Sequence, residues 1–184
     1  MGTEADRNRR FERFAVPHLD AAFNLARWLT RNEHDAEDVV QEAYLRAFKY
    51  FDGYNGGSGR AWLLAIVRRT CFTWLARNRP GEMVPFDEAA AEVIDARDGW
   101  TSFTDGAANP ESHAMRAVDR DMLNQAIASL PPLFREALVL RELQELSYKE
   151  IAAIAEVPIG TVMSRLARAR ALLQEALAPA MSRG

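Results

Sequence analysis

Four polar or basic side chains near the carboxyl end have the types and spacing that suit contacts with duplex DNA. At 100° per residue, they share one arc of a predicted helix that begins at residue 159: Thr161, Ser164, Arg165 and Arg168. Arginine suits guanine edges or phosphates, and Ser and Thr suit either. The opposite arc is apolar and is predicted to face the core: Ile159, Val162, Met163, Leu166, Ala169 and Leu173. The basic arc is therefore predicted to enter a major groove.

A shorter helix is predicted just before this one. Ser147 and Glu150 form a capping box, so the helix should run from Tyr148 to about Ala155, with Lys149 on the same DNA surface. Residues 156–158 make the turn, and together the segments predict a helix-turn-helix. An ordinary amphipathic helix with a solvated basic face is the alternative. The spacing and the absence of acids from the basic arc disfavour it.

A second basic segment, residues 60–79, holds five arginines and no acid. A helix is predicted over 60–77. It would place Arg68 and Arg69 outward, interleaved with Trp62 and Phe72, and Arg60 at its start would belong to the same basic face. Arginines bind phosphates and aromatic rings stack on unpaired bases, so this face suits single-stranded DNA. The alternative is that both rings pack against a neighbouring helix and the arginines are only solvated.

A glycine-rich loop, residues 52–59, comes just before this second basic segment. The loop has four glycines and is lined by Tyr54, Asn55 and Ser58. Such a loop is expected to close over a base turned out of the duplex.

Residues 33–42 contain five acids and no Lys or Arg. Asp35 is predicted to cap a helix that runs to about Phe51. One polar side of this helix would hold Glu37, Asp38, Gln41 and Glu42. Acids in a first turn complement the helix dipole, and this cluster also suits docking of a basic partner helix.

The helical periodicity predicts an all-α protein with two small helical domains. The first covers residues 1–80, with a helix over 8–31 that Pro17 is expected to divide. A flexible acidic linker follows at 81–111; residues 82–111 hold eight acids and one basic residue. The second domain covers 112–184, with a helix to Leu130, a Pro131-Pro132 break and a helix over 133–143 before the helix-turn-helix.

Catalytic and metal chemistry are not indicated. The chain has one cysteine, three widely spaced histidines and no nucleophile–base pair, so neither an enzyme nor a cofactor is expected. The charged amino terminus is no signal peptide, and no run of ~20 apolar residues spans a bilayer. A cytoplasmic protein without direct membrane insertion is expected, and direct redox sensing by Cys71 is not.

Taken together, these segments resemble a bacterial sigma factor of the extracytoplasmic-function (ECF) group, within the sigma-70 family. Residues 35–48 look like region 2.2 of that family and residues 59–69 like its regions 2.3 and 2.4. Residues 130–142 look like the start of region 4, and 147–153 with 160–170 look like its helix-turn-helix. The four motifs occur in order and cover nearly the whole chain.

The resemblance implies a subunit that binds core RNA polymerase and directs promoter-specific initiation. The first domain would melt the −10 element, with the flipped base in the 52–59 loop, and the second would read the −35 element through Arg165 and Arg168. Asp38, Gln41 and Glu42 would face the clamp helices of the polymerase β′ subunit, and the second domain would meet the β flap. An anti-sigma factor is also implied, as is a linker whose acids mimic nucleic acid near the RNA exit path.

Two positions depart from the family pattern. Arg69 stands where members often have Asn, so the −10 base preference does not carry over. Glu156 stands where the turn often has Gly; a non-glycine residue fits there if its φ stays negative, so the turn geometry does not carry over from the family. The alternative function is a standalone helix-turn-helix regulator of duplex operators, which has no use for an arginine–aromatic face beside a glycine-rich loop.

Overall fold

A computed structural model describes residues 3–83 and 113–182 of the chain. All the regular structure in these two ranges is helical, as predicted, and neither contains a strand. The amino-terminal unit comprises α1 (Glu4–Ala15), α2 (Leu19–Thr30), α3 (Glu33–Tyr50) and α4 (Gly59–Asn78). The carboxyl-terminal unit comprises α5 (His113–Ser129), α6 (Pro132–Leu138), α7 (Tyr148–Ala155) and α8 (Ile159–Met181). Most of the predicted linker lies outside the described residues.

Helix boundaries follow local sequence signals in most places. A 3₁₀ turn over Val16–His18 separates α1 from α2, which confirms the break expected at Pro17. The prediction that Asp35 caps α3 is wrong. Asn32 is the cap, because its side chain accepts a hydrogen bond of 3.0 Å from the Asp35 N–H.

The capping box of α7 is confirmed in both directions. The Ser147 hydroxyl accepts from the Glu150 N–H, and the Glu150 carboxylate accepts from the Ser147 N–H at 2.8 Å. The helix predicted over 133–143 is continuous in the structure, where α6 passes directly into a π turn over Val139–Leu143. Glu156 does not meet the condition of a negative φ: its φ is 57°, because the chain leaves α7 through a left-handed residue.

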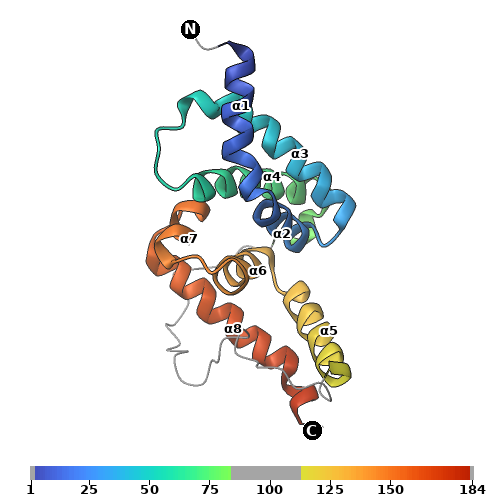
Figure 1. Cartoon of the computed structure of the whole chain (residues 1–184). Coiled ribbons are helices and arrows are strands. Elements are labelled where there is room, and N and C mark those ends of the chain that lie inside the picture. The colour runs from blue at the N-terminus through green and yellow to red at the C-terminus, as the bar shows by residue number, and fades with distance from the viewer. Residues whose placement is uncertain (1–2, 84–112, 183–184) are drawn as a thin grey trace.

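The two units pack against each other through one continuous apolar core. Leu29, Val39 and Val67 from the first unit share this core with Leu138 and Leu166 from the second. Figure 1 shows α6 beside α2 and α7 beside α4.

A buried polar side chain crosses the junction between the units. Arg135 of α6 donates to the carbonyls of Ala128 at 2.9 Å and Leu130 at 2.8 Å within its own unit. It also donates to the Leu29 carbonyl of α2 at 3.1 Å. Burial lowers the pKa of Arg135 to about 10, so the guanidinium remains charged at neutral pH. The units are therefore held in a closed arrangement.

Candidate nucleic-acid interface

The helix-turn-helix of α7 and α8 presents part of the predicted duplex-reading surface to solvent. Lys149 and Arg168 are exposed, and Thr161 and Ser164 are half-buried. Arg165 lies apart from them and is only 7% exposed. It is on the side of α8 that packs toward α6, where its charge acts against the burial that raises the pKa of Glu136.

The predicted rotation of α8 is therefore partly wrong. Ile159 and Met163, expected in the core, are 46% and 45% exposed. The arc that is buried contains Val162, Leu166, Ala169 and Leu173. A helical wheel identified this apolar arc but not its edges, because the fit of α8 against α6 decides which flanking side chains are covered. Met163 is the residue of the outward face that the sequence prediction missed.

Three arginines of α4 contact the second unit. Arg60 donates to the backbone oxygen of Gln144 at 2.9 Å and to its side-chain oxygen at 2.7 Å. Arg68 forms an ion pair with Glu136, and Arg69 forms one with Glu156. The structure brings these three arginines together with the carboxyl-terminal unit rather than leaving them in open solvent.

The two aromatic residues of this face are half-buried, so the packing alternative that the sequence left open describes them better than exposed rings do. The Trp62 ring lies 5.7 Å from Phe14 and 5.3 Å from Tyr54, measured between centroids. Phe72 lies under the Arg68 guanidinium, 4.5 Å from its carbon to the ring centroid. Trp62 thus belongs to an aromatic cluster that extends from α1 to the glycine-rich loop.

The glycine-rich loop has a defined shape. Tyr54 donates a hydrogen bond of 2.7 Å to the Gly57 carbonyl, and Gly56 and Gly57 have φ of 94° and 86°. Ser58 caps α4 by accepting from the Ala61 N–H at 3.1 Å, and Asn55 is exposed. The loop therefore places Tyr54 beside Trp62 at the start of α4.

A close approach fixes the residue type where the loop enters α4. A Cβ on Gly59 would lie 2.5 Å from Cε2 of Phe14, so a larger residue would displace the ring. The aromatic cluster and the start of α4 are thus coupled through this glycine.

The acidic side of α3 is open to solvent. Glu37, Asp38, Gln41 and Glu42 are exposed, and Glu42 forms an ion pair with Arg46. Asp35 is set apart, half-buried, with its Oδ2 3.9 Å from an Arg79 nitrogen.

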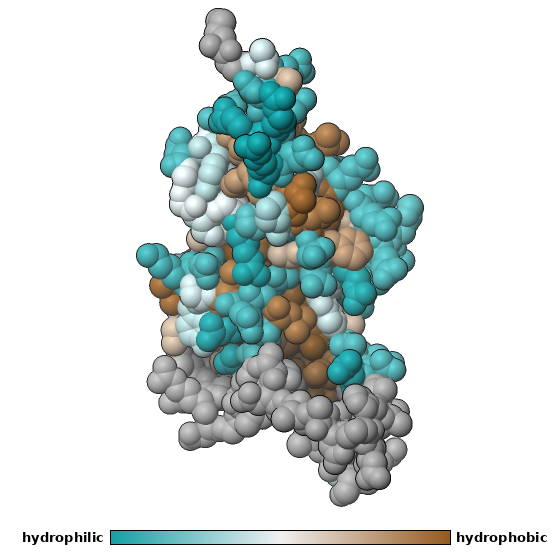
Figure 2. Space-filling view, viewed as in Figure 1, coloured by the Kyte–Doolittle hydropathy of each residue, from teal (hydrophilic) through white to brown (hydrophobic). Residues whose placement is uncertain are grey.

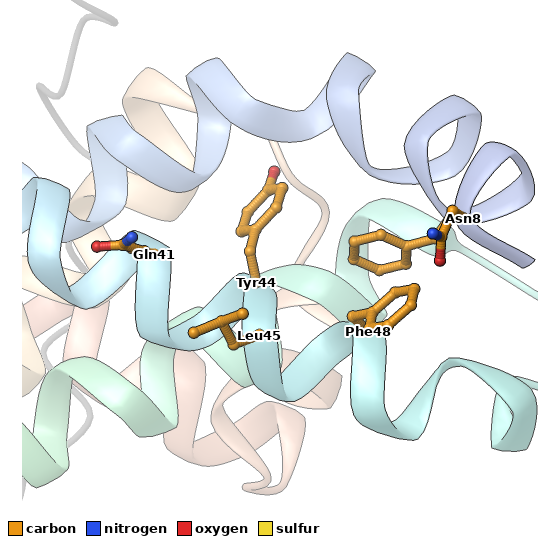
Figure 3. A pocket seen from close by; sticks show the side chains of 6 residues that line it. Asn8, Gln41, Tyr44, Leu45 and Phe48 are labelled. Carbon is orange, nitrogen blue, oxygen red and sulfur yellow. The ribbon is translucent and has the colours of Figure 1, made fainter. Parts of the chain in front are cut away.

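An apolar groove continues from this acidic side. It has a volume of about 430 Å³, and its lining residues are Asn8, Phe11, Gln41, Tyr44, Leu45 and Phe48. Figure 3 shows Gln41, Tyr44 and Leu45 in succession along α3. Leu45 is 67% exposed, and Figure 2 shows hydrophobic surface over α3 beside the hydrophilic surface of α1. An acidic flank beside an apolar groove can accept an amphipathic helix with basic residues.

The described ranges contain no group of three His, Cys, Asp or Glu side chains placed to hold a metal ion. In those ranges, no helix has the length and apolarity needed to cross a bilayer. Burial raises the pKa of the Cys71 thiol well above its usual range, which suppresses thiolate chemistry there.

Comparison with known proteins assigns a family to both units. Residues 6–80 match the Sigma-70 region 2 family, and residues 120–173 match Sigma-70, region 4. The ECF RNA polymerase sigma-E factor of Escherichia coli (strain K12) is 36% identical over 81% of this chain and 77% of its own. The ECF RNA polymerase sigma factor SigE of Mycolicibacterium smegmatis is 37% identical over 88% of this chain and 59% of its own.

A solved structure has a similar fold over nearly the full length. It is the sigma factor RpoE in complex with the anti-sigma factor NepR from Bartonella quintana. It aligns with a TM-score of 0.64 and 26% identity, over 92% of this chain and 98% of that one. The chain therefore belongs to the ECF sigma factors of the sigma-70 family, the factors that direct transcription initiation.

Proposed function

We propose that the amino-terminal unit binds core RNA polymerase and opens the −10 element, while the carboxyl-terminal unit reads the −35 element. The domain limits proposed are 1–80 and 112–184, with 81–111 as an acidic linker. The observation that carries this proposal is that one chain holds an acidic helical face, an arginine–aromatic face and a helix-turn-helix on separate surfaces.

The polymerase contact is proposed for α3. Glu37, Asp38, Gln41 and Glu42 form its exposed polar side, with Asp35 at the amino end, and the groove beside Leu45 adds apolar area. This combination suits the basic clamp helices of β′, because rim charges steer association and the groove supplies burial. The β flap is proposed to meet the carboxyl-terminal unit.

The −10 contact is proposed for the loop and α4. Tyr54, Asn55, Ser58 and Trp62 surround the position for a flipped base, and the arginines of α4 bind phosphates: Arg60, Arg68 and Arg69, with Phe72 beneath Arg68.

The −35 contact is proposed for the outward side of α8 with Lys149 of α7. Thr161, Ser164 and Arg168 supply polar contacts, and Arg165 joins them once its surroundings open. Met163 adds an apolar side chain suited to the thymine methyl group.

The protein makes no covalent change in this proposal and needs no cofactor. It acts in the cytoplasm and is restrained by an anti-sigma factor, whose membrane or soluble nature is left open. The relative from Bartonella quintana supports this partner, because its structure was solved with an anti-sigma factor.

Run-off transcription with purified core polymerase tests the proposal. Product from a cognate promoter should appear only when the protein is added, and Asp38→Lys should abolish it by reversing a charge that meets β′. Glu12→Lys, the same reversal on exposed α1, is the matched control and should remain active. Initiation without the protein, or tight promoter binding by the free protein, would indicate a standalone regulator instead.

Strand opening is tested separately with Trp62→Ala. Loss of base stacking should reduce permanganate reactivity at the −10 element by about 10- to 100-fold, with duplex binding retained. Trp74→Ala removes an indole from the same helix outside the proposed site and should open DNA normally. Equal loss of duplex binding and opening in Trp62→Ala would show a packing role only.

A further inference from the structure

The face of α4 proposed to bind single-stranded DNA is occupied by the chain's own carboxyl-terminal unit. Each of its three arginines meets an oxygen acceptor there: Arg60 meets Gln144, Arg68 meets Glu136, and Arg69 meets Glu156. The acceptors come from α6, the segment after the π turn, and the end of α7. A guanidinium donates to carboxylate oxygens in the same geometry that it uses for phosphate oxygens.

We infer that Glu136, Gln144 and Glu156 form an intramolecular latch that occupies the phosphate-binding arginines of α4 and keeps the free protein from engaging single-stranded DNA. The inference rests on the proposed −10 role of α4. It adds the regulation of that site by the chain itself, before any second protein is bound.

The latch has a buried centre and a solvated edge. Glu136 is 1% exposed and Arg68 is 15% exposed, whereas the side chains of Arg69 and Glu156 are 59% and 51% exposed. Gln144 ties the interface further, because its Nε2 donates to the Ala21 carbonyl of α2 at 3.2 Å. Nucleic acid therefore cannot reach Arg68 until the units move apart.

The chemistry of the centre suits a latch that releases. Burying two charges costs solvation free energy that their mutual attraction only partly returns. Burial raises the pKa of the Glu136 carboxyl despite the adjacent Arg68, which shows the cost of its charge. A competing surface that binds the separated units can therefore open the interface.

The glutamate at the latch edge offers a clean variant. Glu156 has φ of 57°, so Glu156→Gly removes the ion pair with Arg69 while relieving a left-handed conformation. Relief of this backbone strain stabilises the closed and open arrangements equally, so it does not change the ratio of their populations. Glu145→Gly is the matched control, because the exposed Glu145 has φ of 54° and forms none of the three latch contacts.

The experiment uses the full chain with Arg13→Cys and Glu175→Cys, exposed positions on α1 and α8, as spin-label sites. Cys71 is buried and should remain unlabelled. Pulsed electron–electron distances should form one narrow distribution in the parent protein and in Glu145→Gly. The double variant Gln144→Ala with Glu156→Gly should add a broad population at longer distances.

Single-strand binding is measured on the same proteins by anisotropy of a fluorescein-labelled (dT)₁₂. Glu156→Gly should raise affinity about threefold, and the double variant about thirtyfold, because an exposed ion pair and a charge-assisted hydrogen bond are removed in turn. Glu145→Gly should leave the affinity unchanged.

The outcomes separate the latch from the proposed function. An unchanged distance distribution in the double variant overturns the latch, even if run-off transcription succeeds. Separated units without a gain in (dT)₁₂ affinity overturn the inhibitory role and the −10 assignment of α4 together. If run-off transcription fails while the units separate and the (dT)₁₂ affinity rises as expected, only the proposed polymerase-dependent steps are overturned and the latch stands.

Discussion

The two surfaces proposed to bind DNA differ in how much of each is available in the closed arrangement. On α8, Arg168 and Met163 are open to solvent, whereas three arginines of α4 contact the other unit: Arg60, Arg68 and Arg69. Apart from the buried Arg165, the proposed duplex-reading surface is thus open to solvent while the proposed single-strand surface is covered. On the proposed function, the difference indicates an order of events, in which the −35 contact begins to form before the −10 strand is engaged.

The largest expected effect comes from breaking the junction that covers α4. Arg135→Ala would leave the carbonyls of Leu29, Ala128 and Leu130 without their buried donor, at a cost of about 3 kcal/mol in the free energy of unfolding. Urea denaturation measures this cost. Arg168→Ala, on the open surface, should change stability by less than about 0.5 kcal/mol. Equal losses would show that Arg135 does not join the units.

The open surface is tested next through its arginines. Arg168→Ala should cost about 1–3 kcal/mol in discrimination of the −35 element, measured by anisotropy against a scrambled duplex with the polymerase-bound protein. Arg165→Ala should cost a similar amount if Arg165 joins the surface after opening. A change in urea stability without a change in discrimination would assign Arg165 to packing alone.

A smaller effect is expected for Met163. Met163→Ala should cost about 1 kcal/mol on a −35 duplex through loss of apolar contact with a thymine methyl. Replacing thymine with deoxyuracil removes the same methyl, so the variant should then lose nothing further. Additive losses from the two changes would place Met163 away from the bases.

The smallest expected effect is the pH response of the covered surface. Burial raises the pKa of Glu136 above its unfolded value, and the facing Arg68 and Arg165 oppose this shift. The contribution of Glu136 to the free energy of unfolding should therefore be fully present below the unfolded pKa and be lost as pH rises through the folded pKa. Urea denaturation at pH 5 and 7 measures this change, which Glu136→Gln should remove. A response retained in Glu136→Gln would assign the titration to another group.

Local chemistry made much of the fold predictable. The bounds of α7 followed from Ser147 and Glu150, because a capping box specifies a helix start within the segment itself. The break at Pro17 followed from a residue that lacks an N–H donor. In both cases the determining contacts lie within a few residues of each other.

Features set by the junction were not predictable in this way. The covering of Arg68 depends on Glu136, which lies 68 positions away, and the exposure of Met163 depends on how α8 packs on α6. Helical periodicity identifies the apolar arc of a helix, but it does not show which part of the chain packs against the polar arc of the same helix. The cap at Asn32 was missed for a simpler reason, since Asn32 and Asp35 are both suitable cap residues and lie only three positions apart at the start of α3.

The hydrogen bond from Arg135 to Leu29 also bears on how the protein is synthesised. The two residues are 106 positions apart, so at about 5–20 residues per second roughly 5–20 s of translation separate them. During that interval only the part of α2 that packs on α6 lacks its partner, because α3 and α4 of the same unit can already cover the rest. The amino-terminal unit should therefore fold first during synthesis and keep this one apolar patch exposed until α6 emerges, and slow codons between the two units would prolong that exposure.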